Sequence, residues 1–337
     1  MSEQPMVAVR DLKVRFKRGG QTLSAVNGVS LQVARGEVLA LIGESGSGKS
    51  VTLRALMRLH SERTTTIEGQ IDIAGQDLMK LSGSQLQALR GPVASMIFQE
   101  PLLALDPVYT IGQQIIEALR RHGSMSMSKA EARAAALDAL HSVRIPSPEQ
   151  RLDAYPHEMS GGMRQRAMIA LALACKPQIL LADEPTTALD ATVQIQILIL
   201  LRELQQALGL SIIFVTHDIG AAVEVADRVA VMYGGRIVEQ APLAELLDNP
   251  QHPYTRVLLG TRPKDGLRKG ERLISIPGAP PDLANLPAGC AFASRCPHSS
   301  DVCRRDVPAI ESAGTEHTVS CHHWNQAPVQ SLRESMS

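Results

Sequence analysis

The stretch VLALIGESGSGKS, residues 38–50, decides the fold of this chain. Its first five residues are all apolar and predict a short strand of the kind that is buried in parallel sheets. The eight residues that follow fit the pattern G-x-x-x-x-G-K-[ST], in which a glycine-rich turn leads into a helix. The backbone N–H groups of such a turn point at negative charge, which predicts a loop that wraps a phosphate chain.

Two side chains of this loop have predicted contacts with a nucleotide. Lys49 should reach the β- and γ-phosphates, and Ser50 should hold Mg²⁺. The remaining members would wrap the phosphates with their backbone: Gly43, Glu44, Ser45, Gly46, Ser47 and Gly48. A Gly/Ser-rich turn with a chance lysine is the alternative, but the full pattern between an apolar strand and a helix favours the phosphate loop.

A second apolar stretch, ILLADEP at residues 179–185, ends in two carboxylates. The end of a parallel strand lies at the edge of the sheet where the phosphate loop also lies, so this pair should sit beside the loop. Asp183 would hold the Mg²⁺ shell, and Glu184 would orient or deprotonate the attacking water. A solvated acidic loop is the weaker alternative, because the pair follows a buried strand.

Length and charge exclude several classes of protein. The chain has 337 residues, of which 44% are apolar, which suits a globular core domain plus an extension. Lys+Arg and Asp+Glu both number 34, and this balance argues against nucleic acid as a partner. The longest apolar run, residues 167–175, has nine residues, whereas a membrane-spanning helix needs roughly 20. Because the N-terminus also lacks the apolar region of a secretory signal, we expect a protein that stays in the cytosol.

Strand-like and helix-like segments alternate along most of the chain. Residues 1–80 are rich in strands, and residues 110–175 have the apolar spacing of helices. Strands then return at 179–182, 212–216 and 229–232, and helical stretches at 191–208 and 219–226 separate them. This alternation predicts an α/β fold with a parallel sheet and helices on both faces.

The composition changes after about residue 260. Residues 261–337 hold 8 of the 20 prolines and four of the five cysteines, and their periodicity is weak. We therefore expect one domain over residues 1–260 and a Cys/Pro-rich C-terminal extension over residues 261–337. The extension should be rich in loops and should bury little apolar surface alone.

The segment MSGGMRQR, residues 159–166, is the motif that discriminates best between families of proteins with a phosphate loop. A serine and two glycines at the start of an apolar helix make a second surface for anions. With this segment, the chain resembles the nucleotide-binding subunits of ATP-binding cassette (ABC) transporters. Ser160, Gly161 and Gly162 match the signature motif of that family, LSGGQ, although methionines stand where its leucine and its glutamine are usual. This variant is familiar in the peptide-importing branch.

The resemblance assigns roles to further residues. Gln99 matches the Q-loop glutamine, which senses Mg²⁺ and the attacking water, and Asp190 ends the D-loop sequence TALD. His217 matches the switch histidine, which contacts the γ-phosphate. Phe16 stands where the family places an aromatic ring against adenine, and a core residue of a strand is an equal alternative. The implied catalytic residues are Glu184, His217 and Gln99, and the implied Mg²⁺ ligands are Ser50, Gln99 and Asp183.

The resemblance also implies a fold and an assembly. The fold is an ABC-type P-loop NTPase core with an antiparallel β subdomain near the N-terminus and a helical subdomain over residues 105–165, approximately. Two cassettes face each other, and each ATP lies between one phosphate loop and the signature segment of the partner. The second ATPase subunit is a copy of this chain or a different chain, and a different chain is favoured.

Two membrane permease subunits complete the implied transporter, with an extracytoplasmic solute-binding protein as an indirect partner. The chain would then be a peripheral protein on the cytoplasmic face of the inner membrane. The sequences HPYT at 252–255, GC at 289–290 and RCP at 295–297 resemble the oligopeptide/dipeptide branch. Relatives with this layout handle dipeptides, longer peptides, glutathione or nickel complexes, so the substrate stays open.

A soluble, non-transport ABC ATPase is the competing class. Translation-type members carry two phosphate loops in one chain, and repair-type members carry a long coiled-coil insertion. This chain has one phosphate loop, and Asp183 follows Lys49 by only 134 positions. A non-catalytic regulatory subunit is disfavoured because the lysine, both carboxylates and the switch histidine are all present.

Four cysteines form the last pattern: Cys290, Cys296, Cys303 and Cys321. Four thiols in a segment without a core of its own suggest a metal that staples it. Their spacing leaves a zinc ion, a [4Fe–4S] cluster and four thiols without metal open. The resemblance to dipeptide-importer ATPases favours the cluster, in a structural or redox-sensing role. Cys175, at the end of an apolar helix, is expected to be a small core residue.

Overall fold

Runs of consecutive apolar residues form the centre of the main sheet. The computed structural model describes residues 4–122, 127–187, 189–260, 276 and 278–325. Five central strands are mutually parallel: β3 (Val38–Ile42), β6 (Ala94–Ile97), β7 (Ile179–Asp183), β8 (Ser211–Thr216) and β9 (Arg228–Tyr233). They lie in the order β9-β3-β8-β7-β6, so the phosphate-loop strand has parallel neighbours on both sides. The predicted parallel sheet is confirmed.

Both faces of strand β3 are covered. Ala40 and Ile42 pack in one core, which also holds apolar side chains of α7 (Gly161–Leu173) and α8 (Ala191–Leu208). Leu39 and Leu41, on the opposite face, pack in a second core with α1 (Lys49–Leu56) and the N-terminal strands. Burial on both faces explains why the strand is a continuous apolar run instead of an alternating one.

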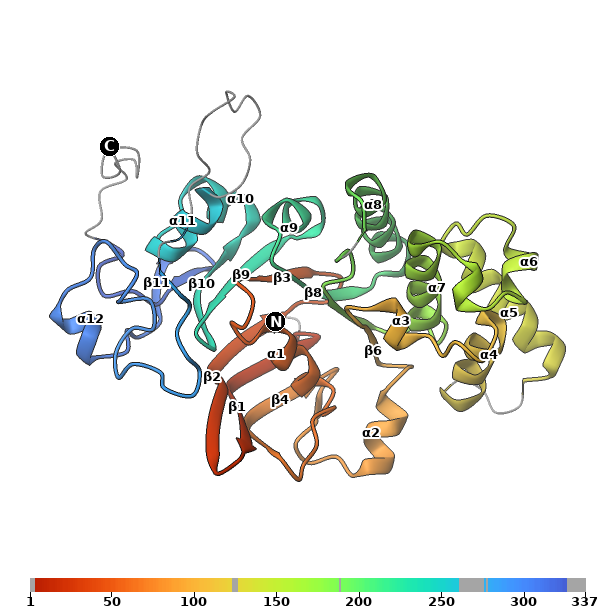
Figure 1. Ribbon diagram of the computed structural model, residues 1–337, viewed down its shortest axis with the longest axis horizontal. Coiled ribbons are helices and arrows are strands. Elements are labelled where there is room, and N and C mark those ends of the chain that lie inside the picture. Colours follow the sequence, from red (N-terminus) through yellow and green to blue (C-terminus); the bar gives the residue numbers. More distant parts are fainter. Residues whose placement is uncertain (1–3, 123–126, 188, 261–275, 277, 326–337) are drawn as a thin grey trace.

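A second, antiparallel sheet lies beneath α1 in Figure 1 and has the order β2-β1-β4-β5. Its strands are β1 (Val7–Arg18), β2 (Gln21–Val33), β4 (Thr65–Ile73) and β5 (Gln76–Asp77). Antiparallel strands of this kind can keep one face on a core and the other in water. The expected antiparallel β subdomain near the N-terminus is therefore present.

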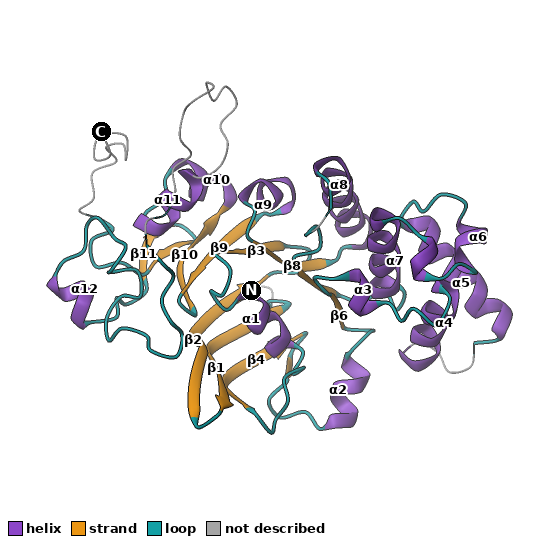
Figure 2. Ribbon diagram, viewed as in Figure 1, coloured by secondary structure: helices purple, strands orange, loops and turns teal. Residues whose placement is uncertain are grey.

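Helices gather at one end of the molecule, on the right of Figure 2. They follow β6 along the chain and pack against α7. Their bounds are α3 (Pro101–Ala104), α4 (Ile111–His122), α5 (Lys129–Ser142), α6 (Pro148–Leu152) and a 3₁₀ turn at Pro156–Glu158, while α2 (Gly83–Leu89) precedes β6. These helices lie where the helical subdomain was expected, and its limits as a domain stay a prediction.

The C-terminal extension, which was expected to be rich in loops, also contains two short strands and one short helix in its described part. Strands β11 (Glu311–Gly314) and β12 (His317–Val319) form a hairpin that adds to the main sheet, because β12 pairs with β10 (Arg236–Pro242). Helix α12 (Asp301–Arg305) also lies in the extension. The helices that directly precede the extension are α9 (Ile219–Val225), α10 (Leu243–Asp248) and α11 (Pro253–Gly260). Short strands with weak periodicity fold here because an existing sheet edge supplies their hydrogen-bond partners.

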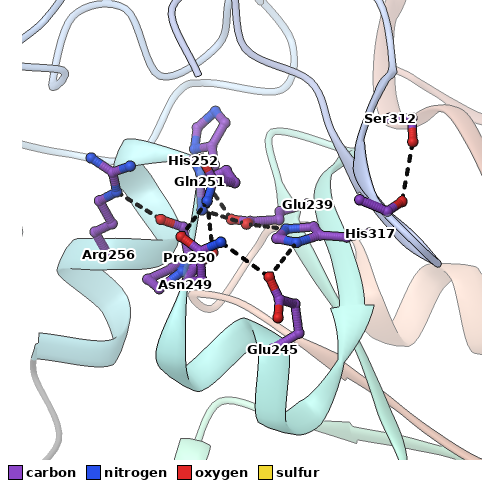
Figure 3. A network of polar contacts seen from close by, with 10 residues as sticks. Glu239, Glu245, Asn249, Pro250, Gln251, His252, Arg256, Ser312 and His317 are labelled. Atoms are coloured by element: carbon purple, nitrogen blue, oxygen red, sulfur yellow. Dashed lines mark hydrogen bonds and ion pairs between the residues drawn. The ribbon is translucent and has the colours of Figure 1, made fainter. Parts of the chain in front are cut away.

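A buried ion pair ties this hairpin to the sheet, as Figure 3 shows. Glu239 on β10 and His317 on β12 are both about 1% exposed, and His317 Nε2 lies 2.8 Å from Glu239 Oε1. The same carboxylate accepts the backbone N–H groups of Gln251 and His252 at 2.6 and 2.9 Å. One buried carboxylate thus fixes both the hairpin and the turn that leads into α11.

Candidate functional site

The loop between β3 and α1 can only be made with glycine at two positions. Gly43 has a φ of +152°, and a Cβ there would lie 2.2 Å from the carbonyl oxygen of Met232. Gly48 has a φ of +104°, and a Cβ there would lie 2.5 Å from the carbonyl oxygen of Ala25. The pattern of the sequence therefore corresponds to real steric requirements, and the loop is wrapped closely against β9 and β2.

Lys49 lies across this loop and not in solvent. It is 4% exposed, and its Nζ donates to the carbonyl oxygens of Gly43 at 2.8 Å and Glu44 at 3.0 Å. Burial lowers the pKa of its ammonium group, while the negative charges of Glu184 and Asp183 act in the opposite direction. The ammonium group is thus held inside the loop, where phosphate oxygens would be bound.

Asp183 and Ser50 meet as the sequence predicts. Ser50 Oγ donates to Asp183 Oδ1 at 2.6 Å, and Arg54 Nη2 lies 3.6 Å from Oδ2. Burial raises the pKa of Asp183, and the Ser50 hydrogen bond opposes that shift. Within the described residues, Asp183 Oδ2 and the hydroxyl of Ser47 are buried without a hydrogen-bond partner. Hydroxyl and carboxylate oxygens with spare acceptor capacity suit Mg²⁺.

Glu184 is the meeting point of two other segments and of the turn that it belongs to. Its Oε2 accepts hydrogen bonds from Gln99 Nε2 at 3.2 Å and Thr187 Oγ1 at 2.9 Å, and His217 Nδ1 lies 3.1 Å away. The backbone of Glu184 has a φ of +46°, a conformation that non-glycine residues seldom adopt. The structure thus brings together the three residues predicted to be catalytic. Thr187 was predicted only as the first residue of the D-loop sequence, and its contact with Glu184 was not predicted, although its position three residues after Glu184 was the available signal.

The signature segment lies at the start of α7. Ser160 caps this helix, because its Oγ accepts the N–H of Met163 at 3.3 Å, and both Ser160 and Gly161 are exposed. A Cβ on Gly162 would lie 2.8 Å from Val193 on α8, the helix that Asp190 caps. The signature segment is therefore in contact with the helix that follows the D-loop, and its serine faces outward.

Phe16 is half-buried on β1. It packs against the core beneath α1, and its ring meets the ring of His60 edge-on at 5.3 Å between centroids. The geometry fits a strand residue at the margin of the core, and contact with adenine stays a prediction.

The four cysteines of the extension line one small cavity of about 20 Å³, together with His252 and Phe292. Burial raises the pKa of Cys296 and of Cys321 to about 11. A cavity of this size holds about one water molecule. In the described part of the chain, no group of three or more His, Cys, Asp or Glu side chains is arranged to hold a metal ion. The structure therefore does not support the expected [4Fe–4S] cluster. Cys175, predicted as a core residue, is half-buried at the end of α7.

Together these features define a P-loop nucleoside triphosphatase, in which a phosphate loop and two strand-end carboxylates share one sheet edge. A family model described as ABC transporter matches residues 26–187, and one described as oligopeptide/dipeptide transporter, C-terminal region, matches residues 238–303. The chain belongs to the family of ATP-binding proteins of ABC transporters, in the branch with this C-terminal region.

Curated relatives match along nearly the whole chain. The probable peptide ABC transporter ATP-binding protein y4tR of Sinorhizobium fredii is 47% identical over 322 residues, which cover 95% of this chain and 96% of the relative. The dipeptide transport ATP-binding protein DppD of Bacillus subtilis is 47% identical over 326 residues, which cover 96% of this chain and 95% of the relative.

Solved structures confirm the cassette fold. The dimeric bacterial ABC transporter cassette MJ0796 matches with a TM-score of 0.64 and 30% identity, over 71% of this chain and 99% of that chain. The cbiO1 protein of Clostridium perfringens, part of the transporter complex cbiONQ, matches with a TM-score of 0.62 and 28% identity, over 73% and 92%. Among the described helices of this chain, none is long and apolar enough to cross a membrane.

Proposed function

We propose that this chain hydrolyses ATP to power the import of peptides through a membrane permease. The observation that carries the ATPase role is the convergence of Gln99, Thr187 and His217 on one carboxylate oxygen of Glu184. The peptide substrate rests on the C-terminal region shared with oligopeptide/dipeptide transporters and on relatives named for peptide or dipeptide transport.

Mg²⁺ would be held by Ser50 and Asp183, and it would neutralise charge that develops on the phosphates. Lys49 would bind the β- and γ-phosphates after exchanging the loop carbonyls that it now contacts. Gln99 donates its side-chain amide N–H to Glu184, and its amide oxygen would be the third proposed Mg²⁺ ligand. Glu184 would orient the attacking water, and His217 would contact the γ-phosphate.

Two cassettes would form the active unit. Ser160 and Gly161 are exposed at the start of a capped helix, which makes a surface for anions. The phosphates of an ATP bound to a second cassette would contact this surface. Dimeric structures of MJ0796, one of them bound to ADP and Pi, support this arrangement. ATP binding would close the pair and hydrolysis would reopen it, with a different ATPase chain or a second copy as partner.

An apolar groove supplies a surface for the permease. It has a volume of about 480 Å³, and Leu59, Phe98 and Tyr109 on its wall are 41%, 39% and 51% exposed. Phe98 directly precedes Gln99, so a movement in the groove would reach Glu184 through one peptide bond and one hydrogen bond. We place the chain on the cytoplasmic face of the inner membrane, with two permease subunits and, indirectly, a solute-binding protein.

Uptake assays in a strain lacking the gene test this function. The strain should lose uptake of a labelled dipeptide or oligopeptide, and the unchanged chain should restore it while Glu184→Gln should not. If the strain instead loses uptake of nickel or glutathione, the protein belongs to the same class of transporter with that compound as its substrate. Unaffected uptake of all three, with no co-purifying permease, would favour a soluble non-transport ATPase.

The four-cysteine cavity is a separate proposal. We propose that its four thiols bind a [4Fe–4S] cluster in the protein as made in the cell. The observation behind this proposal is that all four thiols line one cavity, and the cavity of about 20 Å³ would have to widen to take the cluster. Anaerobic purification with iron and sulfide analysis is the test. A colourless protein without iron would end the cluster proposal, and stoichiometric zinc would replace it.

A further inference from the structure

Glu44, the second residue of the phosphate loop, is held by two partners from beyond the ATPase motifs. Its backbone N–H donates to the hydroxyl of Tyr254 at 2.9 Å. Its two carboxylate oxygens accept from Arg295, with Nη1 to Oε2 at 2.7 Å and Nη2 to Oε1 at 3.1 Å. Such a two-point contact fixes the orientation of the carboxylate as well as its position.

Arg295 is itself immobilised within the C-terminal extension. Its side chain is 3% exposed and also donates to the hydroxyl of Tyr233 and to the carbonyl oxygen of Ile276, both at 3.2 Å. Its guanidinium carbon lies 5.8 Å from the centre of the Tyr233 ring, which packs against the ring of Tyr254. This frame joins the extension, the end of β9 and the phosphate loop.

The negative charge of Glu44 makes its contact with Arg295 important for phosphate binding. A carboxylate in a loop that binds a polyanion would repel the phosphates unless a cation neutralises it. Its backbone matters as well, because Lys49 Nζ donates to the carbonyl oxygens of Gly43 and Glu44. A shift of residue 44 would therefore also disturb the lysine that binds phosphate.

We propose that Arg295 is a positioning residue for ATP binding: it neutralises and orients Glu44 and so keeps the phosphate loop in its binding conformation. The C-terminal extension is then part of the ATP site. This role depends on ATP binding by the loop and on neither the transported substrate nor a metal in the cysteine cavity.

A rescue experiment on the full chain tests the proposal. The dissociation constant of the non-hydrolysable analogue AMP-PNP with Mg²⁺ is measured by calorimetry for Arg295→Met, for Glu44→Gln and for the double variant. Arg295→Met should weaken binding about tenfold, because it leaves a carboxylate unpaired beside the phosphates. The double variant should return to within about threefold of the unchanged chain, since the unpaired charge is gone.

The rescue separates this role from a merely structural one. If Arg295 only held the extension in place, Glu44→Gln would not restore binding, and a double variant as weak as Arg295→Met would overturn the proposal. Unchanged affinity in a folded Arg295→Met variant would overturn it as well. Arg304→Met, which removes an exposed arginine of the same extension, is the matched control and should bind normally.

Steady-state kinetics and a conservative variant complete the test. In Arg295→Met, the KM for ATP should rise while kcat changes less than about twofold, because the residue acts on binding and not on the reacting atoms. If Arg295→Met does not fold, the affinity of the Arg295→Lys variant for AMP-PNP tests the proposal. It keeps the charge beside Glu44 and loses the two-point contact, so affinity should fall by only about threefold. Loss of tenfold or more in a folded Arg295→Lys variant would contradict charge neutralisation.

Discussion

Replacing Glu184 with glutamine isolates the chemical step from ATP binding. Glutamine keeps the size of the side chain but loses the charge, so Oε2 can no longer take a proton from water or accept strongly from Gln99, Thr187 and His217. Loss of a positioned general base commonly lowers kcat by about 10²–10⁴-fold. ATP binding should persist or become tighter, because one negative charge beside the triphosphate site is removed. Burial raises the pKa of Asp183, and the negative charge of Glu184 adds to that shift.

The assay is phosphate release by the assembled transporter at saturating ATP, with binding measured separately. Glu184→Gln should bind ATP with Mg²⁺, release phosphate at least about 10²-fold more slowly, and accumulate as a closed cassette dimer on gel filtration. Glu224→Gln, an exposed glutamate on α9, is the matched control and should have normal turnover. Near-normal turnover in Glu184→Gln would refute the assignment of the base.

Three further perturbations probe the loop, the signature segment and the extension. Ser160→Arg in both cassettes should abolish hydrolysis in the assembled transporter while ATP binding by the isolated chain persists, and unchanged hydrolysis would refute the shared site. Gly43→Ala should lower the free energy of unfolding by about 1–3 kcal/mol and weaken ATP binding, measured by denaturation and calorimetry, because its Cβ would meet a carbonyl oxygen of β9 at 2.2 Å. The hydrogen bond to Glu239 raises the pKa of His317 in the folded protein. The stability that this hydrogen bond contributes is therefore complete below the pKa of His317 in the unfolded chain, about 6.5, and is lost as pH rises through the pKa in the folded protein. Urea unfolding from about pH 6 to about pH 9 should show this loss, and His317→Gln should flatten it; an unchanged slope would contradict the assignment.

The central sheet and the ATP site could be predicted because their determinants are local. Buried parallel strands are continuous apolar runs, and glycine positions in the loop reflect steric contacts that any residue with a Cβ would violate. The position of Asp183 beside Ser50 followed from the topology of parallel strands, whose carboxyl ends share one edge. Short motifs therefore carried most of the information about the site.

The contacts of the extension could not be predicted, because they join segments far apart in the chain. Arg295 and Glu44 are 251 residues apart, and neither residue type is unusual in its own surroundings. The hairpin of β11 and β12 has little apolar alternation of its own, and it folds because the edge of β10 offers unpaired backbone groups. Buried pairing partners such as Glu239 and His317 leave no periodic signal, since each stands beside another polar residue in a short strand.

The arrangement around Glu184 also explains how one site can serve as a switch. A carboxylate oxygen has about two lone-pair directions, yet Oε2 lies within 3.2 Å of donor groups on Gln99, Thr187 and His217. These groups belong to three segments that follow three different strands, β6, β7 and β8. If a bound nucleotide, with its metal and water, takes over these donors as proposed, binding would release the segments from the shared oxygen. The groove beside Phe98 and the D-loop beside the signature helix are attached to two of these segments. Competition for one oxygen atom can therefore link phosphate binding to both surfaces without any change in the central sheet.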